Sequence, residues 1–334
     1  MIDFPVDIVY TWVDGSDPKW LKKKDDTLNK YSSFHKSEEI SGRGRFDTNK
    51  ELIYSLRSID KYAPWVRKIF IVTDDQAPTW LNLNHPKIQI VDHVEIFPST
   101  KYLPCFNSNA IEMCLHKIQD LSEHFLSFND DFFLGRPTLK SDFYHESNKP
   151  KLFSSKGSFF KKRYLTIRKE NPHQYAILNA RKLVFENFNI ILNFNLRHAV
   201  KTLKKSHLIT LEEKFPEYFE ITRKHQFRDN SDIWVMALDA YYSVATKNNI
   251  PFFIKPYRKD YIKYKFKFIR KNRDYTYIPL SLSESRIKSK FKTIEKYNPL
   301  MFCINDGPDG DNLKAKLMID FLNNFYVDKS EFEL

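Results

Sequence analysis

The stretch HFLSFNDDFFLG, residues 124–135, decides the fold and raises the question of function. Apolar residues on both sides of its centre predict one buried strand. Asp130 and Asp131 stand side by side within that strand. Moving two carboxylates out of water is costly unless a partner compensates for the lost hydration. A divalent cation with a preference for oxygen ligands, Mg²⁺ or Mn²⁺, would be such a partner.

The segments that precede this stretch alternate between strand-like and helix-like patterns. Strands are predicted over residues 6–13, 67–75 and 87–93, and helices over 48–63 and 109–123. Thr48 with Glu51, and Asn109 with Glu112, have the spacing of a capping box at the two helix starts. This order predicts an α/β fold with a mainly parallel, Rossmann-like sheet flanked by helices.

The second half of the chain is more polar and predicts a helical lobe. Helices are expected over residues 208–224 and 231–248, the second with Ser231 as its N-cap, and short strands over 258–279 and 300–306. We therefore divide the chain into an α/β half (1–137), a helical insertion (138–250) and a closing region (251–334). The closing region combines a basic strand segment with a last strand and helix, and completes a single domain.

The net charge of +12 predicts an anionic partner. Nucleic acid, anionic lipid, a nucleotide and an anionic polysaccharide all fit that charge. In the basic stretch 255–273 lysines alternate with aromatic residues, which fits a strand with aromatic side chains inward and lysines facing an anion. Acids at several predicted strand ends argue against the rival class, a nucleic-acid-binding protein. The sequence has no G-x-G-x-x-G and no Walker A motif, so it lacks the usual dinucleotide and P-loop signatures.

Cysteine use and apolar runs bear on the compartment. Cys105, Cys114 and Cys303 form no C-x-x-C pair, which excludes a disulfide framework or a zinc cage of cysteines and favours a reducing setting. The first ten residues carry acids where a signal peptide carries Lys or Arg. Because no apolar run is long enough to span a bilayer, we expect a cytoplasmic protein.

Acids follow the predicted strands repeatedly, and ligands of such sheets bind outside the carboxyl ends of the strands. The positions are Asp14, Asp17, Asp74, Asp75 and Asp92. For the last three, a simple role in starting turns is the competing interpretation. Asn305 and Asp306 close a further predicted strand, where they would complete a metal site with the acid pair.

Arg228 lies just before the helix expected at Ser231, where an arginine would clamp a phosphate. A surface ion pair with Asp229 or Asp232 is the equally weighted alternative. His198 and His225 are candidate bases because they flank the helical segment that leads to Arg228.

Four stretches together resemble a known family. They are DIVYTWVDGSDPKW (7–20), RFDTNKELIYSLRSIDKYAPWVRKIFIVTDDQAPTWL (45–81), LSFNDDFFLG (126–135) and CINDG (303–307). In this order they resemble the Stealth family, capsular polysaccharide phosphotransferases related to the animal GlcNAc-1-phosphotransferase that marks lysosomal enzymes. The resemblance implies a glycosyltransferase-A-like fold. It also implies transfer of hexose- or HexNAc-1-phosphate from a UDP-sugar such as UDP-GlcNAc to an acceptor hydroxyl, with release of UMP. The alternative is an ordinary metal-dependent glycosyltransferase that releases UDP.

The resemblance also assigns residues. The acidic motif of the family falls on residues 129–131, its H-x-x-R pattern on His225 and Arg228, and its terminal N-D pair on residues 305–306. Its catalytic histidine falls on His198, although Val200 stands where the family often has Pro. The implied catalytic residues are Asp131, His198 and Arg228, and the implied Mg²⁺ or Mn²⁺ ligands are Asp130, Asp131, Asn305 and Asp306.

Further residues are expected to bind substrate. The turn 11–17 is expected to hold uridine and ribose, with Trp12 either on the nucleotide or in the core. The full set of expected substrate contacts is Trp12, Asp14, Gly15, Asp17, Arg45, Arg57, Asn107, Asn109 and His225. The expected partners are a UDP-sugar donor, an anionic oligosaccharide or polysaccharide acceptor, and the membrane surface or capsule machinery, but not nucleic acid. Peripheral attachment to the inner face of the cytoplasmic membrane follows from these expectations.

Overall fold

A mainly parallel sheet forms the centre of the computed structural model, which describes residues 2–31, 33–42, 46, 50–156, 171–192, 194–247, 250–253, 274–305 and 312–334. The sheet has five strands in the order β3-β2-β1-β4-β8. These are β1 (Val6–Thr11), β2 (Ile69–Thr73), β3 (Ile88–Asp92), β4 (His124–Phe128) and β8 (Lys201–Lys204). The first four are parallel and β8 is antiparallel to β4. The predicted α/β fold with a mainly parallel sheet is confirmed.

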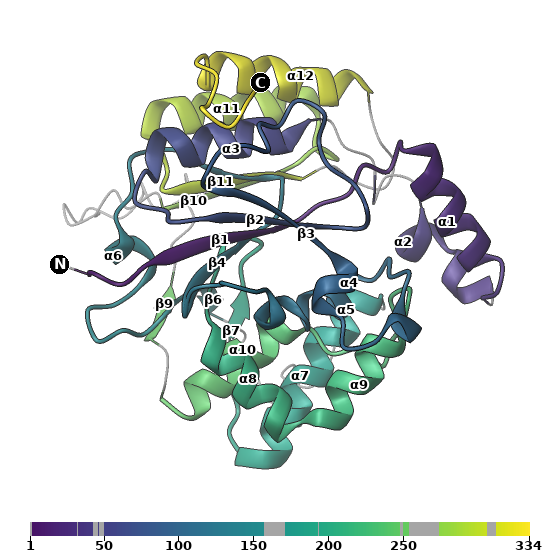
Figure 1. The fold of residues 1–334 in the computed structure, drawn as a ribbon. Helices are drawn as coiled ribbons and strands as arrows, with labels where there is room; N and C mark the ends of the chain where they lie inside the picture. Colours follow the sequence, from purple (N-terminus) through teal and green to yellow (C-terminus); the bar gives the residue numbers. More distant parts are fainter. Residues whose placement is uncertain are drawn as a thin grey trace.

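The central strands are apolar on both faces because helices cover both faces. Every residue of β2 is buried, as are all but the last of β1. Helix α3 (Glu51–Tyr62) covers one face and packs Leu52, Leu56 and Ile59 into the core. Figure 1 shows α3 on the same side of the sheet as α11 (Glu284–Tyr297) and α12 (Asn312–Phe325).

A second, three-stranded sheet is drawn in Figure 1 below α3, α11 and α12 and above β1 and β2 of the central sheet. It consists of β10 (Tyr275–Pro279), β11 (Met301–Asn305) and β5 (Phe132–Leu134), with β5 antiparallel to β11. A third sheet contains β6 (Lys151–Lys156), β7 (Phe194–Leu196) and β9 (Ile250–Phe253). Because β5 follows β4 directly in the sequence, the chain passes from the first sheet into the second at residues 129–131.

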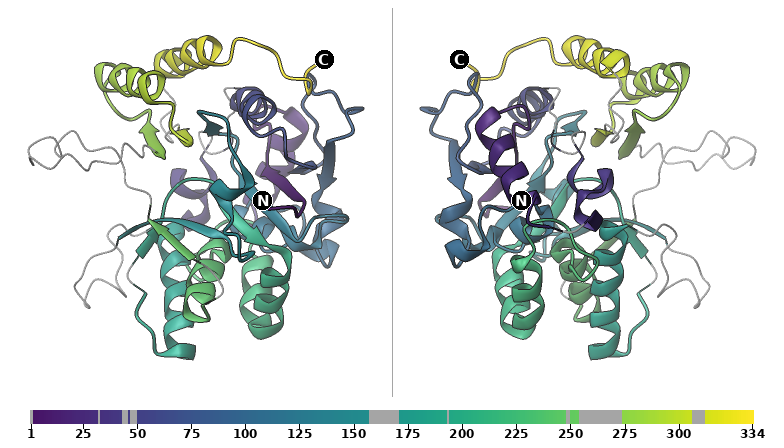
Figure 2. Two further views of the ribbon diagram at one scale, coloured as in Figure 1. Left: turned by 90° about the vertical axis from the view of Figure 1, so that its left-hand side faces the viewer. Right: turned by 90° about the vertical axis from the view of Figure 1, so that its right-hand side faces the viewer.

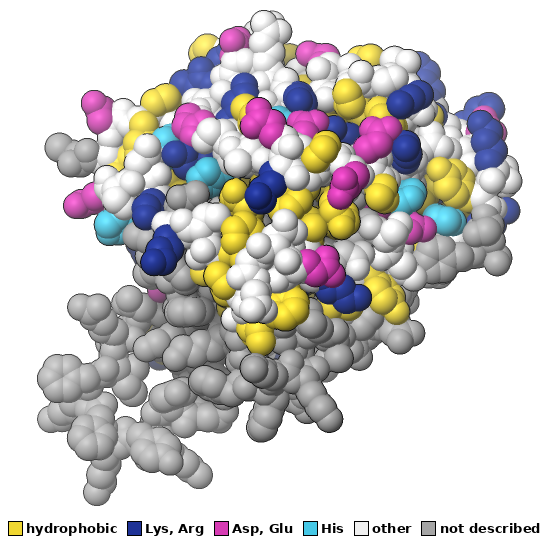
Figure 3. Space-filling model, turned by 90° about the horizontal axis from the view of Figure 1, so that it is seen from below, with side chains coloured by type: hydrophobic (Ala, Val, Ile, Leu, Met, Phe, Trp, Pro, Cys, Tyr) yellow, Lys and Arg dark blue, Asp and Glu magenta, His cyan; other side chains and the backbone are white. Residues whose placement is uncertain are grey.

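The helical lobe predicted for the middle of the chain is present. Its helices are α7 (Pro172–Phe188), α8 (Lys205–Lys214), α9 (Pro216–Lys224) and α10 (Val235–Ala245). Both side views place these helices on the face of the central sheet opposite α11 and α12 (Figure 2). Seen from below, the described surface mixes apolar side chains with Lys, Arg, Asp and Glu (Figure 3). The position of the lobe in the side views shows that its helices cover the second face of the central sheet.

Short helical segments complete the described structure. They are α1 (Pro18–Leu28), η1 (Ser33–Lys36), α2 (Glu38–Ser41), α4 (His93–Ile96), η3 (Thr100–Tyr102), α5 (Ser108–Glu112), η4 (Leu115–Lys117) and α6 (Lys140–Phe143). Among the residues that the structure describes, no helix combines the length and the apolar composition needed to cross a membrane.

The single strand predicted over 124–135 is wrong. β4 ends at Phe128, which pairs with Tyr10, and β5 begins at Phe132, which pairs with Cys303 in the other sheet. Asp130 and Asp131 lie in the turn between the strands, which is closed by a 3.1 Å hydrogen bond from the Phe132 amide to the Asn129 carbonyl. The apolar residues read as one strand because both short strands are fully buried.

The helix predicted over 109–123 is also wrong in extent and in its cap. α5 ends at Glu112 and is followed only by the short η4. Its N-cap is Asn107, whose side chain accepts a 3.0 Å hydrogen bond from the Asn109 amide. Glu112 does not close a capping box, because its carboxylate accepts a hydrogen bond from Trp234 instead.

Three other helix predictions need correction. The helix predicted over 208–224 is two helices, because Pro216 lacks the amide hydrogen that a continuous helix would need. The helix predicted over 231–248 begins at Val235, and Ser231 lies in a turn with Asp229. Helix α3 begins at Glu51, whereas Thr48 and the basic stretch 255–273 lie outside the described residues.

A buried carboxylate joins three parts of the central sheet. Asp7 in β1 is fully buried and accepts hydrogen bonds from Arg67 Nε at 2.9 Å, Arg67 Nη2 at 2.6 Å and the Ser122 amide at 2.7 Å. Arg67 leads into β2 and Ser122 leads into β4. This carboxylate therefore fixes both neighbours of β1.

We expect Asp7→Ala to lower the free energy of unfolding by about 1.5–3 kcal/mol, because hydrogen bonds to a charged group are lost. Urea denaturation followed by circular dichroism measures the change. The matched control is Asp26→Ala, which removes a solvent-exposed ion pair with Lys22 and should change stability by less than about 0.5 kcal/mol. Equal stabilities of the two variants would contradict this role of Asp7.

Candidate active site

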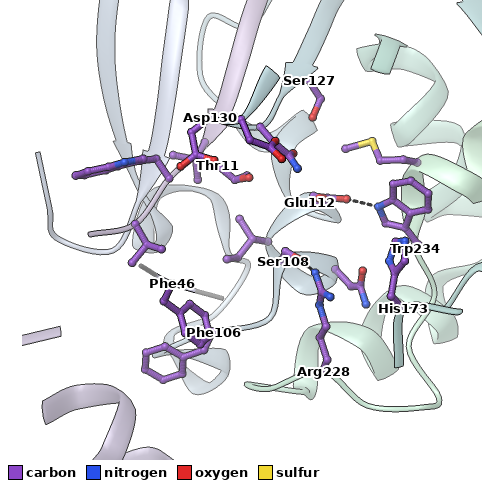
Figure 4. Close-up of a pocket in the computed structure, with 18 of the residues that line it drawn as sticks. Thr11, Phe46, Phe106, Ser108, Glu112, Ser127, Asp130, His173, Arg228 and Trp234 are labelled. Atoms are coloured by element: carbon purple, nitrogen blue, oxygen red, sulfur yellow. Dashed lines mark hydrogen bonds between the residues drawn. The ribbon is translucent and has the colours of Figure 1, made fainter. Parts of the chain in front are cut away.

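A cavity of about 880 Å³ opens at the carboxyl ends of β1 and β4, between the central sheet and the helical lobe. In Figure 4 Asp130 lies on the strand side of this cavity, whereas Arg228 and Trp234 lie on the side of the helical lobe. Seven predicted site residues line it: Trp12, Asn109, Asp130, Asp131, His198, Arg228 and Asn305. The cavity thus brings together residues that are up to 293 positions apart, from Trp12 to Asn305.

Asp131 is the most highly connected carboxylate of the cavity. Its Oδ2 accepts hydrogen bonds from Asn305 Nδ2 at 3.0 Å and Cys303 Sγ at 3.2 Å, and lies 3.4 Å from His198 Nε2. Burial raises the pKa of Asp131, but the contacts with His198, Asn305 and Cys303 outweigh burial and hold that pKa below its ordinary value. Asp131 is therefore ionised. Its other oxygen, Oδ1, is buried and has no hydrogen-bond partner within the described part of the chain.

Asp130 has the opposite electrostatic environment. Burial, the Glu51 carboxylate and the Asp131 carboxylate together raise the pKa of Asp130 well above its ordinary value. Glu51 is the first residue of α3 and also lines the cavity. The carboxylates of Asp130, Asp131 and Glu51 thus lie near one another at the wall of the cavity. Their mutual repulsion is unfavourable unless a positive charge is supplied.

The residues present fit a hard divalent cation. The unpartnered Asp131 Oδ1, the crowded Asp130 carboxylate and the Asn305 side chain offer the oxygen ligands that Mg²⁺ and Mn²⁺ prefer. Asp131, His198 and Cys303 also lie within 4.8 Å of one another. Burial and the nearby Asp131 raise the pKa of Cys303 well above its ordinary value, so without a metal this sulfur is a neutral thiol. Asp306 lies outside the described residues.

His198 lies three residues before the first residue of β8, and its side chain is 42% exposed. Its ring packs edge-on against Phe132 at 5.1 Å and against Tyr277 at 5.8 Å between ring centroids. Together with the Asp131 contact, these rings hold one face of the imidazole toward the cavity. An exposed, oriented imidazole beside a carboxylate can accept a proton from a bound hydroxyl.

Arg228 enters the cavity from the loop between α9 and α10. Its Nη2 donates a 2.6 Å hydrogen bond to Ser108 Oγ, and its buried Nε has no hydrogen-bond partner among the described residues. Burial lowers the pKa of Arg228, while Glu112 and Asp232 oppose that shift. Among the described residues, Arg228 forms no ion pair with Asp229 or with Asp232, the two surface pairs expected as the alternative. A guanidinium with an unused donor inside a cavity is suited to an anionic ligand such as a phosphate.

A buried network positions the loop that carries Arg228. Asp232 is fully buried and accepts hydrogen bonds from Asn107 Nδ2 at 2.8 Å and Asn109 Nδ2 at 3.1 Å, and its other oxygen lies 2.7 Å from His225 Nδ1. Burial lowers the pKa of His225, but the contact with Asp232 outweighs burial and raises that pKa above its ordinary value. His225 and Asn107 therefore contact this loop, whereas Asn109 contacts both the loop and the cavity.

Three residues predicted for the nucleotide lie in the turn after β1 and do not line the cavity. Asp14 accepts hydrogen bonds from the Ser16 amide and hydroxyl, and Asp17 caps α1 by accepting from the Lys19 amide. Gly15 donates to the Phe46 carbonyl, and a Cβ atom at Gly15 would lie 2.2 Å from that oxygen. Gln76 also donates hydrogen bonds to the Asp14 carbonyl and to the Asp17 carboxylate, so the contacts of these residues fix the turn and do not face the cavity.

Of the two remaining predicted arginines, the described one, Arg57, does not line the cavity. Arg57 donates to both carboxylate oxygens of Glu333 and to the Tyr326 carbonyl, so it anchors the C-terminal segment to α3. Arg45 lies outside the described residues.

Glu112, Lys201 and Trp234 line the cavity but were not among the predicted site residues. Trp234 Nε1 donates a 2.6 Å hydrogen bond to Glu112, and burial raises the pKa of Glu112 to about 7. Burial lowers the pKa of Lys201 to about 8, although Glu112 opposes this shift. For Glu112 the local pattern was misleading, because its spacing from Asn109 is that of a capping box. Lys201 carries no signal except its place three residues after His198.

Sequence comparisons assign the family. Three conserved regions of Stealth proteins match this chain: region 1 at residues 4–32, region 2 at 45–152 and region 3 at 197–245. The cavity residues Trp12, Asp130, Asp131, His198 and Arg228 all lie within these regions. The chain belongs to the Stealth family.

Two relatives illustrate the similarity. An exopolysaccharide phosphotransferase of Streptomyces coelicolor is 35% identical over 99% of this chain and 53% of its own length. The capsular polysaccharide phosphotransferase fcs1 of Haemophilus influenzae is 35% identical over 92% of this chain and 80% of its own length. The chain thus spans about half the length of the Streptomyces relative and most of the Haemophilus relative.

Solved structures with a similar arrangement share little sequence with this chain. The galactosyltransferase LgtC, solved with donor and acceptor sugar analogues, has a TM-score of 0.42 at 9% identity and covers 95% of each chain. The inositol-1-phosphate CTP transferase of T. maritima has a TM-score of 0.39 at 13% identity, and covers 95% of this chain and 96% of its own. Because both scores are below 0.5, the family assignment rests on the sequence matches.

The opposite environments of the two aspartates predict opposite effects of neutral substitutions. Asp130→Asn should raise the melting temperature in metal-free buffer, because it removes a carboxylate crowded by Glu51 and Asp131. Asp131→Asn should lower the melting temperature, because its carboxylate is stabilised by the contacts with Asn305, Cys303 and His198. Scanning calorimetry at pH 7 with a chelator present measures both. Shifts of the same sign would contradict the assigned environments.

Proposed function

We propose that this protein transfers a sugar 1-phosphate from a UDP-sugar to a hydroxyl of an acceptor sugar. The product is a phosphodiester in a capsular or surface polysaccharide, and the leaving group is UMP. The observation that carries this proposal is the single cavity in which Asp131, His198 and Arg228 meet. The names of the Streptomyces and Haemophilus relatives, both polysaccharide phosphotransferases, support the same reaction class.

The donor in this proposal is a nucleotide diphosphate sugar, with UDP-GlcNAc or a similar UDP-hexose as the candidate. Asp130, Asp131 and Asn305 would hold Mg²⁺ or Mn²⁺, which when bound supplies positive charge against the diphosphate. Arg228 approaches from the opposite wall and binds the phosphoryl group to be transferred. The pyrophosphate therefore lies between the acid pair and the guanidinium.

The reaction then needs a proton acceptor and stabilisation of phosphoryl charge. His198 accepts the proton of the acceptor hydroxyl, and Asp131 orients the imidazole and stabilises the imidazolium that forms. The acceptor oxygen forms a bond to the sugar-bearing phosphorus while the bond from that phosphorus to the bridging oxygen of UMP breaks. The anomeric C–O bond stays intact. Arg228 stabilises the charge on the transferring group, a role that can be worth about 10³–10⁵ in rate.

The network around Asp232 has a defined part in this proposal. His225, Asn107 and Asn109 fix Asp232, and the Asp229 amide donates to the same carboxylate at 3.1 Å. Arg228 is the neighbour of Asp229, so the network fixes the backbone from which Arg228 projects. We therefore assign His225 and Asn107 to positioning, and Trp12 and Asn109 to contacts with the donor.

The acceptor is expected to be an oligosaccharide or polysaccharide, in keeping with the names of the relatives. Anionic phosphodiester products fit the net charge of +12. The same charge supports peripheral attachment to the anionic inner face of the cytoplasmic membrane, where capsule machinery works. Binding to vesicles with and without phosphatidylglycerol tests the membrane part separately from catalysis.

Substitution of the proposed catalytic residues should abolish transfer without unfolding the protein. Asp131→Asn and Arg228→Ala are each expected to lower kcat by at least about 10³-fold. The matched control is Arg136→Ala, because Arg136 is partly exposed, makes only long ion pairs and does not line the cavity. Circular dichroism establishes that each variant is folded. Turnover of Asp131→Asn at the wild-type rate would refute its proposed role.

The nucleotide product distinguishes the proposed reaction from ordinary glycosyl transfer. A panel of UDP-sugars is incubated with the protein, Mg²⁺ and an oligosaccharide acceptor, and products are separated by mass spectrometry. We expect UMP and an acceptor that gains a sugar phosphate. Release of UDP with an acceptor that gains only the sugar would instead show a glycosyltransferase. Salt-sensitive DNA binding without either product would favour the nucleic-acid-binding alternative.

A further inference from the structure

Lys201 is a cavity residue with an unusual set of hydrogen bonds. It is the first residue of β8 and stands three positions after His198. Its Nζ donates a 2.8 Å hydrogen bond to the Arg197 carbonyl and a second hydrogen bond to the Ala199 carbonyl. These carbonyls belong to the residues on either side of His198. One ammonium group therefore donates hydrogen bonds to the backbone both before and after His198, the proposed base.

The carbonyl of His198 itself is also bound. Tyr275 Oη, at the start of β10, donates a 2.5 Å hydrogen bond to it. Three consecutive carbonyls, of residues 197, 198 and 199, are thus each held by a side chain. Because both peptide groups that flank the Cα of His198 are fixed, the direction in which its side chain leaves the backbone is fixed as well.

The surroundings of Lys201 connect it to the same aromatic wall as His198. Its Nζ lies 5.7 Å from the Phe132 ring centroid and 5.5 Å from the Trp234 ring centroid. Phe132 also packs edge-on against His198, and Trp234 donates to Glu112. The lysine is therefore packed between the ring that supports His198 and the ring that supports Glu112.

Burying an ammonium group is unfavourable unless nearby groups stabilise its charge. The charged or ionisable groups that face Lys201 are Glu112 from α5, Asp131 from the turn after β4 and Cys303 from β11. Among the described residues, neither carboxylate forms an ion pair with Nζ, whose hydrogen bonds go to the Arg197 and Ala199 carbonyls. The positive charge is therefore stabilised by backbone carbonyls and not by a direct ion pair.

A second lysine on the same strand, Lys204, has contacts that do not involve the cavity. Lys204, at the other end of β8, forms a 3.3 Å ion pair with Glu123 and does not line the cavity. Its side chain is 17% exposed. Lys204 thus offers a matched control with the same residue type, strand and partial burial.

We propose that Lys201 is a positioning residue that holds His198 in the orientation needed to accept the acceptor's proton. This inference rests on the proposed function, in which His198 is the base. Lys201 acts through the carbonyls of Arg197 and Ala199, and its charge makes the cavity more favourable for the anionic transferring group. Without it, the backbone around His198 loses two of the three side-chain hydrogen bonds that fix it.

The first test compares Lys201→Met, which keeps the aliphatic length, with Lys204→Met. We expect Lys201→Met to lower kcat for UMP release about 100-fold, as for a displaced catalytic group, with KM for the UDP-sugar changed by less than about threefold. Lys204→Met should leave both constants near the wild-type values. A wild-type kcat in Lys201→Met, or an equal loss in Lys204→Met, would overturn the inference.

The second test restores the ammonium group chemically. Lys201→Cys is treated with 2-bromoethylamine, which converts the introduced thiol to a lysine analogue. The native cysteines are buried, and the treated wild type reports any effect of modifying them. We expect the treatment to recover at least about tenfold in kcat, which loss of general packing would not allow. Full modification at residue 201 without recovery would contradict the positioning role.

The third test does not depend on catalysis, so it separates failure of this inference from failure of the proposed function. NMR spectra of protein with labelled histidine report the His198 ring, assigned by its loss in His198→Gln. Lys201→Met, or Lys201→Gln if the first variant does not fold, should shift and broaden that signal, and Lys204→Met should not. An unchanged His198 signal would refute the inference even if the wild type released no UMP. Conversely, a shifted signal without UMP release would overturn only the proposed reaction.

Discussion

The rest of the site depends on the carboxylate of Asp131, which is buried where two sheets meet. The chain leaves the parallel sheet at Phe128 and enters the second sheet at Phe132. Between these strands, Asp131 receives contacts from β11, through Cys303 and Asn305, and from His198 in the segment that precedes β8. A single ionised group thereby brings three distant parts of the chain into one place. The same geometry leaves its second oxygen buried and available for a cation.

Charge complementarity organises the two walls of the cavity. One wall carries Asp130 and Asp131 from the turn after β4 and Glu51 from the start of α3, which crowd negative charge together. The helical lobe contributes Arg228 to the opposite wall, and β8 contributes Lys201. Neither wall is favourable alone, because buried charge needs a partner. A pyrophosphate bound with a divalent cation would satisfy both walls at once. Without such a ligand, the crowding of Asp130, Asp131 and Glu51 is locally unfavourable.

The sequence was informative about the sheet and about the acid pair. Continuous apolar runs predicted β1, β2 and β3 to within two residues at each end, because parallel strands are buried on both faces. It was uninformative where tertiary contacts override local patterns. β4 and β5 look like one strand, and Glu112 looks like a helix cap although it contacts Trp234, which is 122 residues away. The role of Lys201 could not be predicted from the sequence, because it depends on the backbone carbonyls to which this lysine donates hydrogen bonds.

The most direct measurement is a crystal structure with Mn²⁺ and a non-hydrolysable UDP-sugar analogue, with the manganese located by anomalous scattering. The account predicts manganese at Asp131 and Asp130, with the pyrophosphate between this ion and Arg228. It also predicts the sugar-bearing phosphorus on the side of His198. Manganese and pyrophosphate bound away from Asp131, with no contact to Arg228, would contradict the central claim.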